Sequence, residues 1–305
     1  MKISVIGAGN VGSLAAMRIA QEQLGQVVLV DILGDVARGK SLDLEDACQI
    51  LKIAYSVTGS NKIDAIAGSD IVVITAGLTR KPGMLREELL KKNADIVRGL
   101  CLNIKNLAPD AIVIVVTNPL DLMTYLAFKA TGFPSQRIIG MGLTLDASRF
   151  ANLISKELNV AVTDIEPVVI GSHGEGMMPL PRLTTVKGAD LTKFLDADKL
   201  DELAKNTVLR GQEIVTCLGS GSAFFAPSAA VAEIVRVIAK DQKRILGVSA
   251  CLNGQYGVDE VCIGVPCRIG KKGLEQVIEL ELTAQEKELF VKAAAKLKEQ
   301  NSLLQ

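Results

Sequence analysis

The sequence predicts an α/β protein that begins as a doubly wound parallel sheet and ends as a smaller α+β unit. Three observations point to this fold. In the first half, apolar β-type runs alternate with helix-length segments, and a glycine-rich turn follows the first run. The last third has the pattern of an antiparallel meander. At 305 residues the chain can form about two domains, and we place their boundary after Gly142, giving units 1–142 and 143–305.

The first unit alternates between predicted strands and predicted helices. The strands are apolar nearly throughout, as expected where helices cover both faces of a sheet, and we place them at residues 2–6, 27–31, 71–75, 112–117 and 137–139. Helices are expected between them at residues 11–22, 35–50, 87–107 and 120–130. Because parallel strands need such crossovers, the alternation predicts the doubly wound sheet.

The second unit mixes helices with β-rich runs. One helix is followed by β-rich runs at 166–170 and 182–187, and then by helices at 198–218 and 227–240. Antiparallel strands are expected at 244–252, 260–269 and 274–280, separated by the turn sequences Asn253-Gly254 and Lys271-Lys272-Gly273. A closing helix is expected after Thr283, which can form a capping box with Glu286.

The charges of the chain are balanced, with 34 Lys and Arg against 34 Asp and Glu. No overall field would therefore hold the protein on nucleic acid or on an anionic membrane. The longest apolar runs, such as 111–116, are far shorter than the ~20 residues of a membrane-spanning helix. We interpret the apolar run after Lys2 as the first strand and not as a secretory signal. These features favour a cytoplasmic protein with neither nucleic-acid nor membrane partners.

Six cysteines are scattered through the chain without a C-x-x-C pair, at positions 48, 101, 217, 251, 262 and 267. Cys262 and Cys267 are close in sequence, but a continuous strand would point them to opposite faces. Since the chain contains a single histidine, it is also poorly supplied with zinc ligands. We expect reduced, mostly buried thiols and no metal site.

A glycine-rich motif after the first predicted strand points to a dinucleotide site. It fits G-x-G-x-x-G and consists of Gly7, Ala8, Gly9, Asn10, Val11 and Gly12. Its glycines permit a tight turn, a close approach of the backbone to pyrophosphate, and close packing of helix on strand. A lone motif of this kind can also be a simple glycine turn. Asp31, at the end of the second strand, strengthens the functional interpretation: it would accept hydrogen bonds from ribose hydroxyls and repel a 2′-phosphate, which favours NAD over NADP.

His173 is the only histidine and therefore the candidate proton carrier at neutral pH. Asp146 and Arg149 lie three residues apart at the start of a predicted helix, so both can face one space. In the functional interpretation Asp146 holds the imidazole and Arg149 grips a carboxylate with two hydrogen bonds. In the plain interpretation the histidine is structural and the other two residues form an exposed ion pair.

A cationic segment follows the strand expected at 71–75. Residues 80–86 read Arg-Lys-Pro-Gly-Met-Leu-Arg, which places three cations around a Pro-Gly pair that cannot continue a helix. Ligands of open α/β sheets bind beside such strand ends, so Arg80 and Arg86 are candidate anion clamps on a closing lid. The alternative is a solvated charged loop.

With these residues assembled, the chain resembles the lactate/malate dehydrogenase family, and within it the bacterial lactate-dehydrogenase-like malate dehydrogenases. The resemblance covers essentially the whole length. It rests on motifs in the family's order at residues 7–12, Asp31, 75–77, 80–86, Asn93, 116–121, 145–150 and 173–174. It implies a Rossmann NAD-binding domain over residues 1–142, a C-terminal α+β substrate domain over 143–305, and a homo-oligomer that is a dimer or a tetramer.

The resemblance also implies which residues contact NAD. Besides the glycine motif and Asp31, these are Asn93, Val116, Thr117 and Asn118, of which Asn118 would also reach the substrate. The peptide bond between Asn118 and Pro119 is expected to be cis, as in the family.

For the substrate, the resemblance implies a small dicarboxylate and a reversible hydride transfer between (S)-malate and NAD that gives oxaloacetate and NADH. Arg149 would hold the C1 carboxylate, Arg86 would polarise the C2 oxygen, and His173 paired with Asp146 would exchange the proton. Arg80 would decide the substrate, since the malate enzymes carry arginine there and the lactate enzymes glutamine. A second carboxylate needs a second cation.

The chain departs from the family's pattern at a few positions near these residues. Ser172 and Glu175 stand where glycine and aspartate are usual, and Thr144 stands where valine is usual. None of these departures removes a catalytic group.

Three alternatives remain open from the sequence. An L-lactate dehydrogenase is disfavoured by Arg80. A metal-dependent glycosidase on a related NAD fold would need metal ligands that are not evident here. A non-catalytic NAD-binding sensor would explain the glycines and Asp31, but it gives no reason to combine His173 with Asp146 and the arginines.

Overall fold

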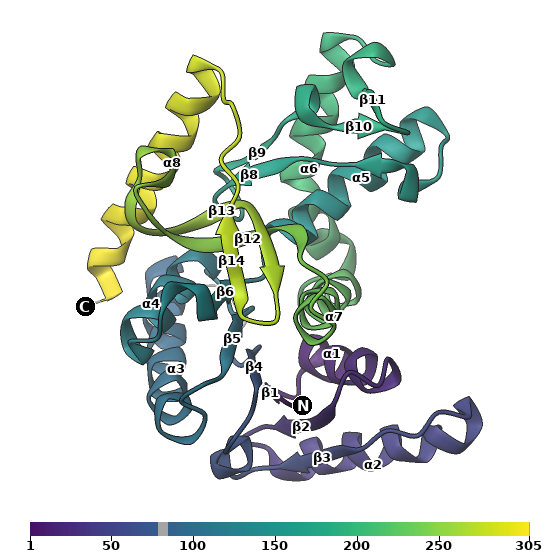
Figure 1. The fold of residues 1–305 in the computed structure, drawn as a ribbon, viewed down its shortest axis with the longest axis vertical. Coiled ribbons are helices and arrows are strands. Elements are labelled where there is room, and N and C mark those ends of the chain that lie inside the picture. The colour runs from purple at the N-terminus through teal and green to yellow at the C-terminus, as the bar shows by residue number, and fades with distance from the viewer. Residues whose placement is uncertain (79–84, 305) are drawn as a thin grey trace.

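A mixed sheet of 11 strands runs through the computed structural model (Figure 1). The structure describes residues 1–78 and 85–304, except for the side chain of Arg86. The strand order is β3-β2-β1-β4-β5-β6-β12-β13-β8-β9, with β14 paired to β13. One sheet therefore connects both halves of the chain.

The first half forms the predicted doubly wound parallel sheet. Its strands are β1 (Lys2–Ile6), β2 (Gln26–Val30), β3 (Val57–Ser60), β4 (Ile71–Ile74), β5 (Ile112–Val115) and β6 (Ile138–Gly140). Its helices are α1 (Asn10–Gln21), α2 (Gly34–Leu51), α3 (Arg86–Leu107) and α4 (Leu120–Thr131). The order 3-2-1-4-5-6 is that of dinucleotide-binding sheets, whose ligands bind outside the carboxyl ends of the strands.

Helices cover both faces of this sheet. Figure 1 shows α3 and α4 on one side and α1 on the other, where α1 packs against α7 (Phe225–Ala239) of the second half. Every residue of β4 and β5 is buried, which explains why these strands are continuous apolar runs. Burying each such aliphatic side chain stabilises the folded state by about 1.5–3 kcal/mol, so these strands contribute much of the stability of the core.

The second half contains the predicted meander and closing helix. The antiparallel strands are β12 (Arg244–Asn253), β13 (Asp259–Gly270) and β14 (Gly273–Val277), and the sheet continues through β8 (Val169–Gly171) and β9 (Met177–Pro179). The helices are α5 (Leu143–Leu158), α6 (Ala197–Leu218), α7 and α8 (Ala284–Asn301). The capping box at the start of α8 is confirmed, because Thr283 Oγ1 accepts from the Glu286 N–H and Glu286 accepts from the Thr283 N–H.

Several strand assignments from the sequence need correction. Strand β3 was not expected, because its four residues include Gly59 and show no apolar run; a Cβ on that glycine would lie 2.4 Å from the Ala37 carbonyl oxygen of the closely packed α2. The strand expected at 182–187 is mostly wrong, since Pro181–Leu183 forms a 3₁₀ turn. Only β10 (Thr185–Val186) remains, in a small sheet with β7 (Ile165–Glu166) and β11 (Ala189–Asp190). Strands β9 and β11 were not expected either.

The expectation of reduced, mostly buried thiols is wrong for one pair of cysteines. Cys251 of β12 lies directly opposite Cys262 of β13, and the two form a disulfide with Cα atoms 3.9 Å apart. Their proximity follows from the register of the hairpin, which spacing along the sequence does not reveal. Of the free cysteines, Cys101 and Cys267 are buried, whereas Cys217 is exposed.

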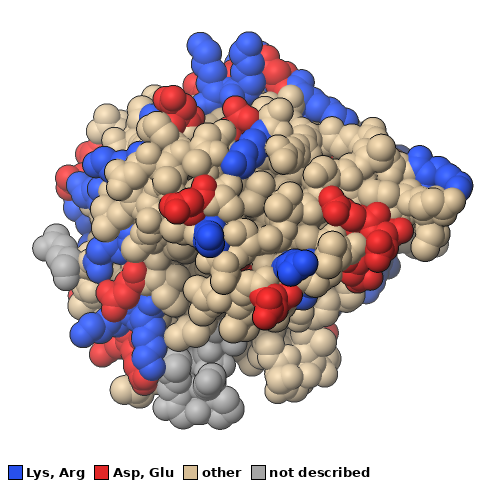
Figure 2. Space-filling view, turned by 90° about the horizontal axis from the view of Figure 1, so that it is seen from below, with Lys and Arg blue, Asp and Glu red and all other residues tan. Residues whose placement is uncertain are grey.

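The surface carries charges of both signs. Figure 2 views the molecule from below, the end at which α2 lies in Figure 1, and shows acidic and basic residues scattered over a mostly uncharged face. Within the described ranges, 1–78 and 85–304, no helix combines the length and the apolar character needed to cross a membrane.

Candidate active site

The glycine-rich turn connects β1 to α1 at the carboxyl edge of the sheet. Gly7 has a φ of +109°, which side-chain-bearing residues rarely adopt, and a Cβ on Gly12 would lie 1.9 Å from the Gly7 carbonyl oxygen. A Cβ on Gly9, by contrast, would meet nothing within 4 Å. The turn therefore needs glycine at both of its ends and leaves open space over its centre. The first turn of α1 adds backbone N–H groups that have no partner within the helix.

Asp31 is tied to the glycine turn. It follows β2, and its Oδ2 accepts from the Ala8 N–H at 2.6 Å while its Oδ1 accepts from the Leu33 N–H at 2.9 Å. A carboxylate has about four acceptor positions, so Asp31 can still accept from ribose hydroxyls.

Lys40 is a residue of this site that the sequence reasoning missed. From α2 its Nζ donates to the Ala8 carbonyl oxygen at 2.6 Å and to Ser13 Oγ at 3.0 Å. It thus fixes the turn against a second helix. Its position inside an amphipathic helix gave no sign of this contact.

Asn93 joins the ends of two neighbouring strands at the same edge. Its buried side chain accepts from the Leu78 N–H at 2.8 Å and donates to the Asn118 carbonyl oxygen at 2.7 Å. Thr117 donates to the Ala76 carbonyl oxygen at 2.7 Å. These bonds hold the segments that follow β4 and β5 together, and the Asn118–Pro119 peptide between β5 and α4 is cis as expected.

Val116 and Asn118 complete this edge. The Val116 N–H donates to the Ile74 carbonyl oxygen at 2.9 Å, which extends the pairing of β5 with β4 by one residue. Asn118 is exposed. The structure therefore brings all the sequence-predicted cofactor residues to the carboxyl edge of the parallel sheet.

His173, Asp146 and Arg149 form one hydrogen-bonded group. His173 follows β8, whereas the other two lie in the first turns of α5. His173 Nδ1 lies 2.7 Å from Asp146 Oδ2, and Arg149 Nη1 donates to Asp146 Oδ1 at 3.1 Å. The Asp146 side chain is fully buried, and those of His173 and Arg149 are 18% and 12% exposed. The interpretation of Asp146 and Arg149 as an exposed ion pair is therefore wrong.

Burial and charge act in opposite directions on the histidine. Burial lowers the pKa of His173, but the charge and hydrogen bond of Asp146 and the charge of Asp121 outweigh it, so that the pKa lies above its ordinary value of about 6.5. The charged imidazole is therefore favoured more than it is in a free histidine. Because Nδ1 faces Asp146, Nε2 is the nitrogen left to exchange a proton with a ligand.

Arg149 retains hydrogen-bonding capacity in this arrangement. Its buried Nε has no hydrogen-bond partner among the described residues, and its Nη1 donates to Asp146. A guanidinium held by one carboxylate oxygen can still bind an anion through its remaining N–H groups.

Asp121 and Ser249 also belong to the site and were not assigned a role from the sequence. Asp121, in the first turn of α4, accepts from the His173 backbone N–H at 2.7 Å and from Ser249 Oγ at 2.6 Å. Both residues are buried. A signal was present, because a charged residue ends the otherwise uncharged motif 116–121.

The departures from the family's pattern lie around this group without replacing any of it. Thr144 donates to the Gly247 carbonyl oxygen of β12 at 2.7 Å, a bond that valine could not make. Glu175 forms an ion pair with Lys296 of α8 at 3.3 Å, and both side chains are more than half exposed, so the pair stabilises the fold little.

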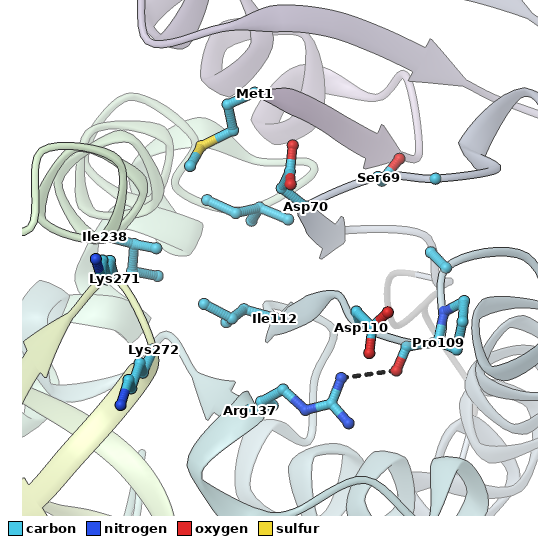
Figure 3. Close-up of a pocket in the computed structure, with 13 residues that line it drawn as sticks. Met1, Ser69, Asp70, Pro109, Asp110, Ile112, Arg137, Ile238, Lys271 and Lys272 are labelled. Carbon is cyan, nitrogen blue, oxygen red and sulfur yellow. Dashed lines mark hydrogen bonds between the residues drawn. The ribbon is translucent and has the colours of Figure 1, made fainter.

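His173 lines a cavity of about 930 Å³ between the start of α4, the loop after β8, and α8. A second cavity, of about 460 Å³, lies at the opposite edge, before β1, β4, β5 and β6. Figure 3 shows Arg137 pointing across it toward Pro109, whose carbonyl oxygen accepts its hydrogen bond at 2.7 Å. This second cavity is remote from the carboxyl edge and contains none of the predicted site residues.

Two of the predicted substrate residues cannot be placed. Arg80 and the side chain of Arg86 lie outside the described part of the chain, and the backbone of Arg86 begins α3. Within the described ranges, no group of three or more His, Cys, Asp or Glu could hold a metal ion.

Two family models together match almost the entire chain. The model described as "lactate/malate dehydrogenase, NAD binding domain" matches residues 1–140, and the model of the "alpha/beta C-terminal domain" of the same family matches residues 143–303.

Individual relatives agree with these models. A malate dehydrogenase of Pelodictyon phaeoclathratiforme is 47% identical over 300 residues, covering 98% of this chain and 97% of the relative. The solved malate dehydrogenase of Salinibacter ruber has a TM-score of 0.95 at 42% identity, covering 100% of this chain and 97% of that one. A lactate dehydrogenase of Cryptosporidium parvum, solved with lactic acid and nicotinamide adenine dinucleotide, has a TM-score of 0.95 at 35% identity and covers 99% of this chain and 97% of that one.

Proposed function

This chain belongs to the lactate/malate dehydrogenase family, and from that premise we propose that it catalyses the reversible, NAD-dependent oxidation of (S)-malate to oxaloacetate. It is an NAD-dependent oxidoreductase. The observation that carries the proposal is the group formed by His173, Asp146 and Arg149. NAD binding alone does not require a titratable histidine next to an arginine that can bind an anion.

The residues at the carboxyl edge fit NAD. The open space over Gly9 and the free N–H groups of α1 suit a pyrophosphate, and Asp31 suits an unphosphorylated ribose. Asn93 and the segment 116–118 would also contact NAD, as the family resemblance implies. When bound, NAD accepts the hydride in malate oxidation and returns it in the reverse direction.

His173 carries the proton in both directions. During oxidation the neutral imidazole takes the hydroxyl proton at Nε2, and during reduction the charged imidazole returns it. Asp146 fixes the ring through Nδ1 and stabilises its charged form. Asp146 and Asp121 outweigh burial and hold the pKa of His173 above its ordinary value, which favours the charged form that returns the proton during reduction.

Arginines would orient the substrate. Arg149 would bind the C1 carboxylate through the N–H groups that Asp146 leaves unused. Arg86 would stabilise the negative charge that develops on the C2 oxygen, and Arg80 would bind the second carboxylate. Asn118, at the same edge as Asn93, would donate to the substrate oxygen.

Replacing Arg80 by glutamine tests the choice of substrate. Losing one partner of a desolvated charge pair costs about 2–5 kcal/mol, so Arg80→Gln should lower kcat/KM for oxaloacetate by ~30-fold or more. Pyruvate, which lacks the second carboxylate, should lose much less. Initial rates of NADH oxidation with the two substrates measure this ratio.

The matched control is Arg98→Gln, which removes an arginine of α3 that pairs with Asp95 and with the Leu304 carbonyl group. It should leave the ratio of oxaloacetate to pyruvate activity unchanged. An unchanged ratio in Arg80→Gln as well would remove Arg80 from substrate selection. Faster turnover of pyruvate than of oxaloacetate by the unaltered protein would favour the lactate dehydrogenase alternative.

We further propose that the protein is a homo-oligomer. The segment that leads into α2 and α2 itself expose large apolar side chains, namely Ile32, Leu33, Val36, Leu42, Ile50 and Leu51. Helix α2 lies at the lower end of the molecule in Figure 1, and large apolar side chains exposed in this number are typical of a contact surface. The apolar residues of α1 are already covered by α7, so α2 is the better candidate for a subunit contact. A mass of 32.4 kDa by light scattering, that of one chain, would contradict this proposal.

A further inference from the structure

Asp121 is a second buried carboxylate beside His173, and the mechanism above gives it no step. It reaches the backbone of the histidine from α4, whereas Asp146 reaches the ring from α5. One oxygen accepts from the His173 backbone N–H at 2.7 Å, and the other accepts from Ser249 Oγ at 2.6 Å. Its residue exposure is 4%, so the charge is nearly unscreened by water.

We propose that Asp121 is a positioning residue for His173, which anchors the backbone of the histidine to α4 and whose negative charge favours the protonated imidazole. The inference rests on the proposed function, since it concerns the proton carrier of that reaction. The hydrogen bond that Asp121 accepts from His173 comes from the backbone and not from the ring, so Asp121 acts through the backbone and through its charge.

The anchoring contact joins the two halves of the chain. Asp121 belongs to the doubly wound half, whereas Asp146 and the loop that carries His173 belong to the second half. The backbone of His173 is thus fixed by one half and its ring by the other. Ser249 of β12, a strand that pairs with β6, holds the Asp121 carboxylate in place. A displacement of Asp121 would therefore move the imidazole relative to the cofactor edge.

The effect of Asp121 on the protonation of the imidazole follows from the charged residues that surround His173. From α5 these are Asp146 and Arg149, which oppose each other, and from α4 the charge is Asp121. Burial raises the pKa of Asp121 to about 6, against the hydrogen bond from Ser249, so the carboxyl group is mainly ionised at neutral pH.

More distant charges at the same cavity are balanced in part. Glu175, Glu299, Lys292 and Lys296 line it, which makes two acidic and two basic groups, and Lys296 pairs with Glu175. Next to Asp146, Asp121 is therefore the described residue whose negative charge acts most on His173.

The experiment is an NMR titration of the imidazole in tag-free protein. Because His173 is the only histidine, its resonances need no assignment. Asp121→Asn keeps the shape, and the amide can still accept from the His173 N–H and donate to Ser249, so mainly the charge is lost. We expect the titration midpoint of His173 to move to lower pH.

The pH dependence of turnover should shift together with the titration midpoint of His173. Each unit by which the midpoint falls lowers the protonated fraction tenfold at alkaline pH, so oxaloacetate reduction by Asp121→Asn should decline at lower pH than in the unaltered protein. Malate oxidation should instead persist to lower pH. A purely structural role would change both rates without moving either profile.

Ser249→Ala is the second variant, because it removes a hydrogen bond that lowers the pKa of Asp121 but keeps the carboxyl group. It should shift the His173 midpoint in the same direction and by less.

The control for both variants is NADH affinity, measured by fluorescence, which reports whether each variant is folded. An unchanged midpoint in Asp121→Asn that binds NADH overturns the inference. If that variant does not bind NADH, an unchanged midpoint in Ser249→Ala overturns it. Absence of oxaloacetate turnover by the unaltered protein would contradict the proposed function, and the titration would still be readable.

Discussion

Replacing His173 by asparagine is expected to lower kcat for oxaloacetate reduction by about 100- to 10,000-fold, the usual contribution of a positioned acid or base. Asparagine preserves much of the shape and can still bond Asp146, but it cannot exchange a proton near neutral pH. No other histidine exists in the chain to replace it. Initial rates at saturating NADH and oxaloacetate measure the effect.

The control for this variant is cofactor binding. The glycine turn, Asp31 and Asn93 do not contact the histidine side chain in the hydrogen bonds observed, so NADH affinity should remain within about threefold of the unaltered protein, the size of a shift below 1 kcal/mol. Retained turnover, with kcat reduced less than tenfold while NADH still binds, would show that His173 is not the proton carrier.

Replacing Arg149 by methionine is expected to lower kcat/KM for oxaloacetate by about 30-fold or more, because the substrate carboxylate would lose its charged partner at a cost of about 2–5 kcal/mol. Most of the loss should appear in KM, since the carboxylate is bound in both the ground state and the transition state. Methionine fills a similar volume, which limits damage to packing. Steady-state kinetics over a range of oxaloacetate concentrations separate the two constants.

Two further variants show whether the loss of activity in Arg149→Met comes from the substrate contact. Arg149→Lys keeps the positive charge beside Asp146 but loses the planar pair of N–H donors, so it should recover only part of the activity. Arg244→Met removes the first residue of β12, an arginine that pairs with Glu233. This variant should leave both kcat and KM unchanged. Equal kinetics of Arg149→Met and Arg244→Met would contradict a substrate role for Arg149.

Much of the fold could be predicted because its signals are local. The parallel strands of the first half are buried on both faces, so they are continuous apolar runs, and helices of ordinary length separate them. The capping box of α8 depends on two residues only three positions apart.

What could not be predicted depends on distant parts of the chain. Strand β3 is an edge strand of four residues whose Gly59 is required by the approach of α2. The pairing of Cys251 with Cys262 follows from the register between β12 and β13. The small strands β7, β10 and β11 are two residues long, too short for a periodic pattern to indicate.

The candidate active site also contains residues that could be predicted from the sequence and residues that could not. His173, Asp146 and Arg149 could be selected by residue type, motif and resemblance, and the structure joins them by hydrogen bonds. Asp121 and Ser249 could not be assigned a role, because their contacts cross between α4, β12 and the loop after β8. No pattern along the chain records which backbone N–H a buried carboxylate accepts from.

The central claim is that one histidine takes the proton in one direction and returns it in the other. The most direct test is the pH dependence of kcat/KM for the unaltered protein, measured for malate oxidation with NAD and for oxaloacetate reduction with NADH. Since the pKa of His173 is raised by Asp146 and Asp121, oxidation should fall as pH decreases through a midpoint above about 6.5, and reduction should fall as pH increases through that region. Profiles that fall on the same side in both directions, or that show no shared ionisation, would contradict it.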